Sequence, residues 1–204
     1  KTIINKDINK YSIYNSVEGT LIRLFYYNNN WYVCTHNRLS AFKSRWGSKQ
    51  SFGQIFVNSL KYIYNSPDSK LKKHIGEMKE GDKILTTFCE KLDKSYQYTI
   101  LLCNNKNTRI VCNNTFPNRI FHISTFKGDD MVEDIDIGLL KPTGFNVKSL
   151  EELISYTQSI DPFQFQGVIL FDKSRTQIKI YNKKYKELYS IRGNQPSVMY
   201  RYLQ

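Results

Sequence analysis

Two pairs of short apolar runs constrain the fold of this chain more than any other feature. Residues 20–27 and 31–35 are rich in β-branched and aromatic side chains and flank three consecutive asparagines. Residues 167–171 and 177–181 flank a second polar segment in the same way. Runs of this length on either side of a polar turn are typical of β-hairpins. The sequence therefore predicts two antiparallel hairpins, one near each end of the chain.

Segments with helical periodicity lie between and beyond these hairpins. Apolar residues recur on one face from Phe52 to Ile63, and the pair Ser149 and Glu152 has the spacing of a capping box before a second such face. Further helices are predicted after Gly81 and over residues 183–191, and further strands over residues 96–103, 109–112 and 119–126. Hairpins interspersed with helices predict an α+β fold. A length of 204 residues predicts one domain, residues 1–204.

The charge of the chain indicates an anionic partner. Thirty lysines and arginines against 18 acidic residues give a net charge of +12. Nucleic acid is the first partner that fits this excess, and a membrane surface is the second. No apolar run approaches the ~18 residues of a membrane span, and no leader precedes Lys1, so we expect a cytoplasmic protein without a membrane anchor. Heavy use of Asn, Ile, Lys and Tyr is typical of an A/T-rich genome, such as that of a virus, a plasmid or a parasite.

The residue types that bind metal ions are scattered along the chain. The four cysteines form no C-x-x-C pair, and the three histidines share no ligand spacing. The acidic residues between Asp129 and Asp136 lack the glycine-containing loop of a calcium site. We therefore expect free thiols in a reducing compartment, a solvated acidic loop and no bound metal.

Four short motifs occur in a fixed order along nearly the whole chain. They are Ser16-Val17-Glu18-Gly19 before an apolar strand, Thr108-Arg109-Ile110-Val111 after a strand that ends near Leu102, Gln166-Gly167-Val168-Ile169-Leu170, and Ile178-Lys179-Ile180-Tyr181. In this order they resemble motifs I, III, IV and V of the covalent nucleotidyltransferases, and above all those of phage-type RNA ligases. The resemblance covers residues 14–190. It implies a nucleotidyltransferase domain with antiparallel sheets and flanking helices.

The resemblance also implies a reaction. In that family a lysine amine attacks the α-phosphate of ATP, carboxylates bind the metal and the ribose, and further lysines neutralise the phosphates. At the matching positions this chain has Ser16 for the nucleophile, Leu102 and Gln166 for two glutamates, and Tyr181 for a lysine. A hydroxyl cannot form the phosphoramidate that an amine forms, and neither Leu nor Gln carries the charge that holds a cation. We therefore expect a domain that has kept the fold without the reaction, with no catalytic residue and no cofactor.

Part of the nucleotide-binding set of the family is retained. Glu18, Gly19 and Lys179 match the family pattern, and Gln166 keeps the shape and hydrogen-bonding capacity of the glutamate. The resemblance implies that these four residues bind a nucleotide. Because motifs I, IV and V lie close together in the family, we also expect Ser16, Glu18, Gln166 and Lys179 to converge on one cleft.

Two basic stretches with interleaved aromatic residues are candidate RNA contacts. One contains Arg38, Lys43, Arg45 and Trp46, and the other runs from Lys179 to Arg201 and includes Lys183, Lys184 and Arg192. Cations of this kind contact phosphates, and rings stack on bases. A solvated surface is the alternative for both stretches. The basic run from Lys70 to His74 is expected to be the solvated face of a helix.

These observations leave three functions open. The first is a catalytically degenerate RNA ligase-like module that binds RNA, including RNA ends or tRNA. The second is an active ATP-dependent RNA ligase or nucleotidyltransferase that uses ATP, magnesium and a displaced lysine, either Lys6 or Lys10. The third is a protein-interaction subunit of an RNA-processing complex. We favour the first, because the altered positions are the charged catalytic ones; a different alignment or an engineered Ser16 is the remaining alternative.

Overall fold

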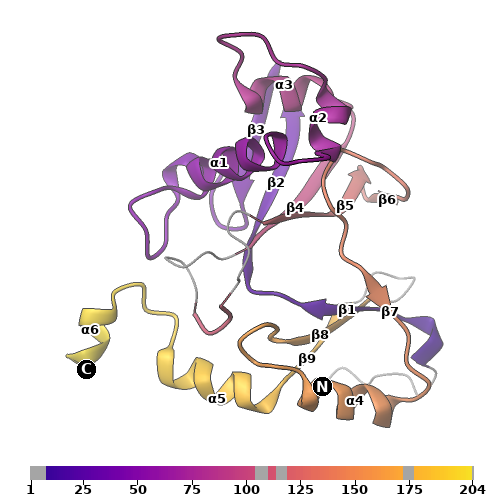
Figure 1. Ribbon diagram of the computed structural model, residues 1–204, viewed down its shortest axis with the longest axis vertical. Coiled ribbons are helices and arrows are strands. Elements are labelled where there is room, and N and C mark those ends of the chain that lie inside the picture. The colour runs from indigo at the N-terminus through magenta and orange to yellow at the C-terminus, as the bar shows by residue number, and fades with distance from the viewer. Residues whose placement is uncertain (1–7, 104–109, 114–118, 172–176, 204) are drawn as a thin grey trace. The chain divides into compact units, whose positions relative to one another are not determined.

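The structure is a computed structural model that describes residues 8–103, 110–113, 119–171 and 177–203. The chain forms two compact units whose segments alternate along the sequence (Figure 1). Unit 1 contains residues 1–18, 104–115 and 142–204, and unit 2 contains residues 19–103 and 116–141. The single domain predicted over residues 1–204 stays a prediction.

The sheet of unit 2 has five strands in the order β3-β2-β4-β5-β6. The strands are β2 (Gly19–Tyr27), β3 (Asn30–Thr35), β4 (Gln97–Cys103), β5 (Ile120–Lys127) and β6 (Asp130–Val132), and every pairing is antiparallel. The first predicted hairpin is confirmed as β2 and β3. Asn28 and Asn29 form its turn with φ of 45° and 59°. Positive φ at both central residues is the geometry of tight hairpin turns, and asparagine tolerates it better than most residues do.

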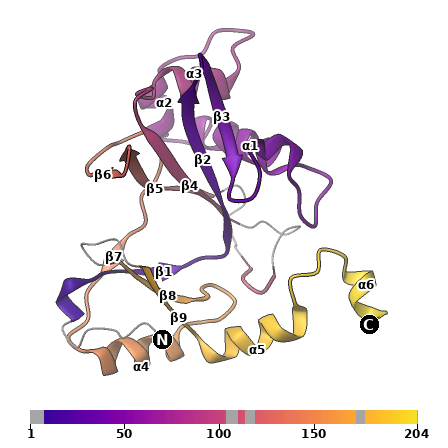
Figure 2. The ribbon, with the colours of Figure 1, turned by 180° about the vertical axis from the view of Figure 1, so that it is seen from behind.

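Three helices cover one face of this sheet, as the opposite views of Figures 1 and 2 show. They are α1 (Phe52–Tyr64), α2 (Lys70–Ile75) and α3 (Ile84–Glu90). Ser51 and Gln54 form a reciprocal capping box at the start of α1. Strand residues such as Ile22 and Ile100 pack with helix residues such as Phe56 in one apolar core. α2 buries Leu71 and Ile75 and exposes its lysines, as predicted for that basic run.

The sheet of unit 1 has four strands in the order β7-β1-β8-β9. The strands are β1 (Ser12–Ser16), β7 (Gly144–Phe145), β8 (Gly167–Phe171) and β9 (Gln177–Tyr181), again paired antiparallel. The second predicted hairpin is confirmed as β8 and β9, and its turn lies outside the described residues. The register places Ser16, the last residue of β1, opposite Gly167, the first residue of β8. β1 is a strand that no local sequence pattern predicts.

The helices of unit 1 are α4 (Leu150–Ser159), α5 (Lys183–Arg192) and the short α6 (Val198–Tyr202), and a 3-10 turn, η1 (Ile8–Lys10), precedes β1. The Ser149 hydroxyl caps α4 by accepting from the Glu152 N–H, whereas the Glu152 carboxylate accepts from the Lys148 N–H. Leu153 of α4 packs with Val168 and Leu170 of β8 in a second apolar core.

The α+β prediction is confirmed. The strand predicted over residues 96–103 is β4, which begins one residue later and ends at the same residue, and the strand predicted over residues 119–126 is β5, displaced by one residue. The prediction of a strand over residues 109–112 is wrong for residues 110–112, which are the ones that the structure describes. Ile110 and Val111 form a bend, and Cys112 is not part of a strand. Two of these backbone N–H groups bind a buried carboxylate, so they are not available to a neighbouring strand.

Candidate functional site

Three motifs of unit 1 meet at the junction of β1 and β8. Gln166 directly precedes β8, and its backbone N–H donates to the Ser16 carbonyl at 2.8 Å. The Asn182 N–H, just after β9, donates to the Gln166 carbonyl at 3.0 Å. Gly167 makes this close crossing possible: its φ is +147°, and a Cβ there would lie 2.0 Å from the Ile180 carbonyl oxygen.

A chain of side-chain hydrogen bonds crosses this junction. The Ser16 hydroxyl donates to Gln166 Oε1 at 3.2 Å, and the Lys179 ammonium donates to the same oxygen. Gln166 Nε2 donates to the Tyr185 hydroxyl at 2.9 Å, and that hydroxyl donates to Glu18 Oε1 at 2.8 Å. Hydrogen bonds therefore join Ser16, Glu18, Gln166 and Lys179 through Tyr185, whereas the predicted cleft at these residues stays a prediction. Their role in nucleotide binding stays a prediction.

Glu18 is held inside this network. Its side chain is 1% exposed, Oε1 also accepts from the Val111 N–H at 2.9 Å, and Oε2 accepts from the Ile110 N–H at 3.0 Å. A carboxylate with three donors of this kind is well stabilised without a metal or a ligand. Glu18 thus fixes the 110–111 segment. Burial and the Glu18 charge together raise the pKa of the Tyr185 phenol, which stays protonated and serves as a donor.

Lys179 is the cation of the network. Burial lowers the pKa of its ammonium group, and the nearby Cys112 thiol and Glu18 carboxylate oppose that shift. Its Nζ lies 4.8 Å from the centre of the Tyr181 ring, and Lys186 Nζ lies 5.3 Å from the centre of the same ring. Tyr181 also stacks on Tyr185, with ring centres 6.0 Å apart. Tyr181, which the motif resemblance matches to a lysine, therefore contacts two cations.

Other predicted residues lie elsewhere. Leu102 of β4 is 2% exposed within the apolar core of unit 2. Gly19 begins β2, where a Cβ would lie 2.6 Å from the Leu102 carbonyl oxygen, so close strand packing accounts for the glycine. Arg38, Lys43 and Arg45 are exposed between β3 and α1, whereas Trp46 is half-buried there.

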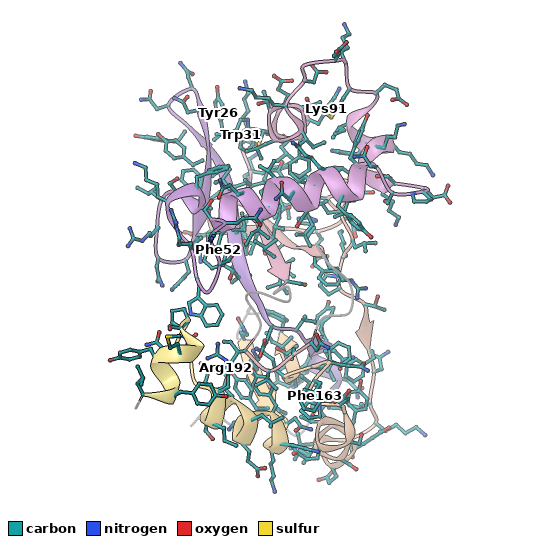
Figure 3. The ribbon with its side chains drawn as sticks, turned by 60° about the vertical axis from the view of Figure 1, so that its left-hand side comes forward. Tyr26, Trp31, Phe52, Lys91, Phe163 and Arg192 are labelled. Carbon is teal, nitrogen blue, oxygen red and sulfur yellow. The ribbon has the colours of Figure 1, made fainter. Side chains whose placement is uncertain are left out.

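Most of the basic residues of the second stretch lie in α5. Lys183 and Lys184 are exposed in its first turn. Arg192, at its last residue (Figure 3), donates to the Gln195 carbonyl at 2.7 Å. Lys6 and Arg109 lie outside the described residues. The backbone of Arg201 is described, but its side chain is not.

Tyr185 and Asn182 contribute to the site although the motifs in the sequence do not predict their roles. Asn182 is 2% exposed, caps α5 through the Tyr185 N–H, and donates to the carbonyls of Thr157, Gln158 and Ile160 at the end of α4. An asparagine directly before a basic helix is an N-cap signal that is visible in the sequence. No local pattern indicates that Tyr185 bridges Gln166 and Glu18.

The family reaction requires ATP and a divalent cation, and the network tests whether the residues present fit them. Each Glu18 oxygen already accepts at least one protein hydrogen bond, and the other family glutamate positions hold Gln166 and Leu102. The described part of the chain contains no group of three or more metal-binding side chains. These residues do not fit a catalytic divalent cation.

Comparisons with known proteins identify viral relatives. No protein-family model matches the chain. The immediate-early protein ICP-46 homolog of Invertebrate iridescent virus 6 is 35% identical over 207 residues, which cover 96% of this chain and 43% of that protein. The homolog of Invertebrate iridescent virus 3 is 32% identical over 93% of this chain and 38% of its own length. ICP-46 of Frog virus 3 is 27% identical, with coverage of 94% and 49%. The chain spans less than half of these curated relatives.

Solved structures identify the fold. RNA ligase of Naegleria gruberi, as a variant with ATP and Mn, superposes with a TM-score of 0.55 at 5% identity and covers 87% of this chain and 51% of the ligase. The same ligase with PPi gives 0.53 at 7% identity, with coverage of 88% and 51%. The chain therefore has the fold of an RNA ligase nucleotidyltransferase domain. In the described residues, none of the helices has the length and apolar character that a bilayer span needs.

Proposed function

We propose that this chain is a catalytically degenerate RNA ligase-like module that binds RNA. The observation that carries the proposal is the hydroxyl of Ser16, which shares the amide oxygen of Gln166 with Lys179. The family reaction needs an amine at the first position and a carboxylate at the second. Here a hydroxyl and a neutral amide bind each other, and the carboxylate of Glu18 is already bound by protein donors.

The surface around α5 supports RNA as the ligand. Tyr181 and Tyr189 are 36% and 37% exposed on either side of the buried Tyr185. Lys183, Lys184 and Lys186 are exposed along the same helix. Rings available for stacking, combined with cations for phosphates, are the usual means of binding single-stranded nucleic acid without strong sequence preference.

The catalytic half of the proposal is tested with labelled nucleotide. Incubated with α-labelled ATP or GTP and magnesium or manganese, the chain forms no acid-labile, alkali-stable adduct, whereas an active RNA ligase assayed in parallel does. A labelled band that disappears in Lys10→Ala or Lys6→Ala would overturn the proposal in favour of a displaced nucleophile.

A second candidate function is nucleotidyl transfer through Lys179. The observation in its favour is the lowered pKa of an amine that shares a hydrogen-bond partner with Ser16. In this reaction Nζ attacks the α-phosphorus of a nucleoside triphosphate, a P–N bond forms, the bond to pyrophosphate breaks, and the amine proton leaves to solvent. Its signature is an adduct that disappears in Lys179→Ala and persists in Lys10→Ala.

The RNA-binding half of the proposal is tested by salt dependence. A surface that contacts about four to six phosphates gives a log–log slope of about −3 to −4 on single-stranded RNA, since each contact contributes about −0.7. The pair Lys183→Ala and Lys184→Ala flattens this slope by about 1.4. The matched pair Lys70→Ala and Lys73→Ala on α2 of unit 2 leaves it unchanged. Negligible binding at ~100 mM salt, or equal effects of both pairs, would favour the protein-interaction subunit instead.

A further inference from the structure

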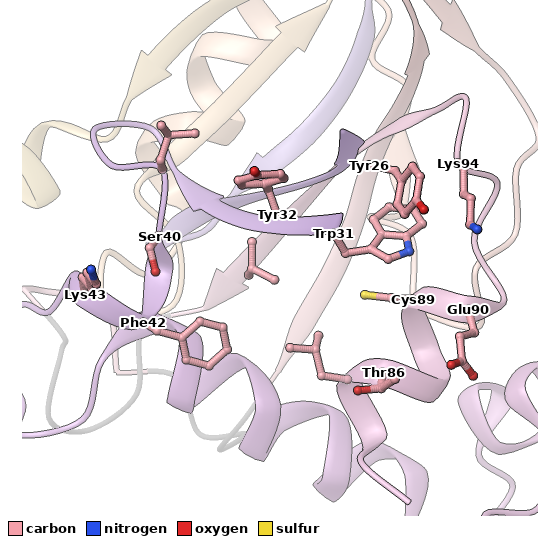
Figure 4. A pocket seen from close by; sticks show the side chains of 13 residues that line it. Tyr26, Trp31, Tyr32, Ser40, Phe42, Lys43, Thr86, Cys89, Glu90 and Lys94 are labelled. Carbon is pink, nitrogen blue, oxygen red and sulfur yellow. The ribbon is translucent and has the colours of Figure 1, made fainter. Parts of the chain in front are cut away.

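A pocket lies at the edge of unit 2, between the β2–β3 hairpin and α3 (Figure 4). Its volume is about 700 Å³. The hairpin, the short 3-10 turn η2 (Ala41–Lys43) and α3 supply most of its lining, and Leu39, Ser40 and Lys94 complete it. Pockets of this size hold small planar ligands such as a nucleotide. The pocket shares only Lys43 with the RNA-contact residues predicted from the sequence.

Four of the 13 lining residues are aromatic: Tyr26, Trp31, Tyr32 and Phe42. Successive side chains of a strand point to opposite faces, so the Tyr32 ring lies on the other face of the sheet from Trp31. Each of the four rings packs against another residue of unit 2. Tyr26 and Trp31 meet edge to face with ring centres 5.5 Å apart, and Tyr32 stacks on Phe25 at 5.2 Å. Phe42 lies against Gly53 of α1, where a Cβ would come within 2.6 Å of the ring. Rings fixed in this way lose little freedom when a ligand binds.

Cations lie at opposite ends of this aromatic lining. Figure 4 shows Lys94 beside Tyr26 and Trp31, and Lys43 at the far end beside Phe42. Lys94 Nζ lies 4.6 Å from the centre of the Tyr26 ring. Glu90 is the acidic residue of the lining, so the two lysines leave an excess of positive charge. Aromatic faces between cations favour a planar ring that carries phosphates.

We propose that this pocket binds one nucleotide of single-stranded RNA, with the base against Trp31 and Tyr26 and the flanking phosphates at Lys94 and Lys43. The inference rests on the proposed RNA-binding function and adds a base-stacking site to it. The other conceivable occupant is an extended peptide that pairs with β3, because β3 is an edge strand of its sheet. The cationic ends favour the nucleotide.

The test uses Trp31 as its own reporter. In a Trp46→Phe background, Trp31 is the remaining tryptophan, since the chain has two. Oligoadenylate and millimolar AMP are expected to quench its emission saturably, and ribose 5-phosphate, which has no base, is not. Tyr26→Ala weakens oligoadenylate binding at least fivefold, in line with the loss of one stacking contact. Tyr62→Ala on α1, a 55% exposed tyrosine outside the pocket, changes binding less than twofold.

A second pair of variants keeps the test valid if Tyr26→Ala disturbs the fold. Lys94→Gln reduces the salt slope of oligoadenylate binding by about 0.7, whereas the matched change Lys91→Gln, three residues away and outside the lining, does not. RNA binding without a change in Trp31 emission, or with unchanged affinity in Tyr26→Ala and Lys94→Gln, overturns the pocket and leaves the proposed function intact.

The remaining outcomes are equally decisive. If no RNA binds at all, the proposed function fails, and the pocket is tested by AMP alone. Saturable quenching of Trp31 emission by AMP then supports the nucleotide pocket, and absence of quenching overturns it. Quenching by an extended apolar peptide, but by neither AMP nor RNA, overturns the proposal in favour of strand addition at β3.

Discussion

The interiors of the two units are stabilised by different kinds of interaction. Unit 2 has an apolar core in which sheet and helix residues share the packing among many side chains. Unit 1 has a smaller apolar core and a buried polar network in which Glu18 binds partners 92, 93 and 167 positions away in the sequence. An apolar core distributes stability, whereas a polar network concentrates it in a few groups that must all be satisfied.

The largest expected effect sharpens this contrast at Glu18. Glu18→Ala leaves the Ile110 and Val111 N–H groups and the Tyr185 hydroxyl without their acceptor, which costs about 3–5 kcal/mol of unfolding free energy. Urea unfolding measures this loss. Glu18→Gln keeps one acceptor oxygen and costs less. A loss below about 1 kcal/mol in Glu18→Ala would remove the network as a source of stability in unit 1.

A second comparison uses one glycine from each unit. Gly167→Ala forces a side chain onto a φ of +147° and onto the Ile180 carbonyl, so we expect a loss of about 2–4 kcal/mol. Gly19→Ala in unit 2 meets the Leu102 carbonyl oxygen at 2.6 Å but has no such φ, and we expect about 1–2 kcal/mol. Thermal unfolding of both variants shows which of the two substitutions destabilises the protein more. The reverse order would mean that β2 and β4 tolerate less movement than β8 and β9.

Patterns within short windows predicted the parts of the fold that depend on neighbouring residues. Both hairpins, α1, α3, α4 and α5 follow from apolar periodicity and caps that lie within a few residues of each other. β1 was missed because its partner β8 lies far along the chain and its five residues have no clear alternation. The segment at Ile110 was assigned to a strand because its composition is β-like, whereas Glu18 decides its conformation. The site residues came from the family resemblance, and the bonds between them came from the structure.

The contrast between the units also predicts a pH effect that belongs to unit 2. His122 of β5 is 3% exposed, Nε2 pairs with the Thr125 hydroxyl at 2.9 Å, and burial lowers its pKa to about 4. An unfolded histidine titrates near 6.5, so the unfolded state binds more protons between these values. Stability is therefore complete above about pH 6.5 and falls by roughly 2–3 kcal/mol as the pH drops towards 4.

Unfolding curves at several pH values measure this loss. His122→Gln removes most of the pH dependence between 4 and 6.5, whereas the exposed His36→Gln leaves it as it is. Equal curves for His122→Gln and the unchanged protein would show that other groups cause the effect.

The smallest expected effect concerns the free thiols, which report on each unit separately. Cys34, Cys89 and Cys103 are buried in unit 2 and Cys112 in unit 1. Burial raises the pKa of Cys89, Cys103 and Cys112 to about 12 each, so few thiolates are present at neutral pH. Reductant leaves the unfolding midpoint unchanged, and an aromatic disulfide reagent labels the native protein slowly, through opening of the structure.

Glu18→Gln turns this labelling into a comparison of the two units. The change weakens contacts within unit 1, so we expect faster labelling of Cys112 and unchanged labelling of the three cysteines of unit 2. Mass spectrometry of the labelled peptides measures the rate at each cysteine. Uniform acceleration of all four cysteines would mean that the two units open together.

The alternation of the two units along the chain also sets an order of assembly during synthesis. All described strands of unit 2 have been synthesised once residue 132 has been made, and its last segment ends at residue 141. β1 precedes the strands of unit 2 in the chain but cannot pair with β8 until residues 167–171 emerge. A nascent chain therefore contains all the described strands of unit 2 while β1 is still unpaired, and an unpaired strand of this kind is prone to aggregation.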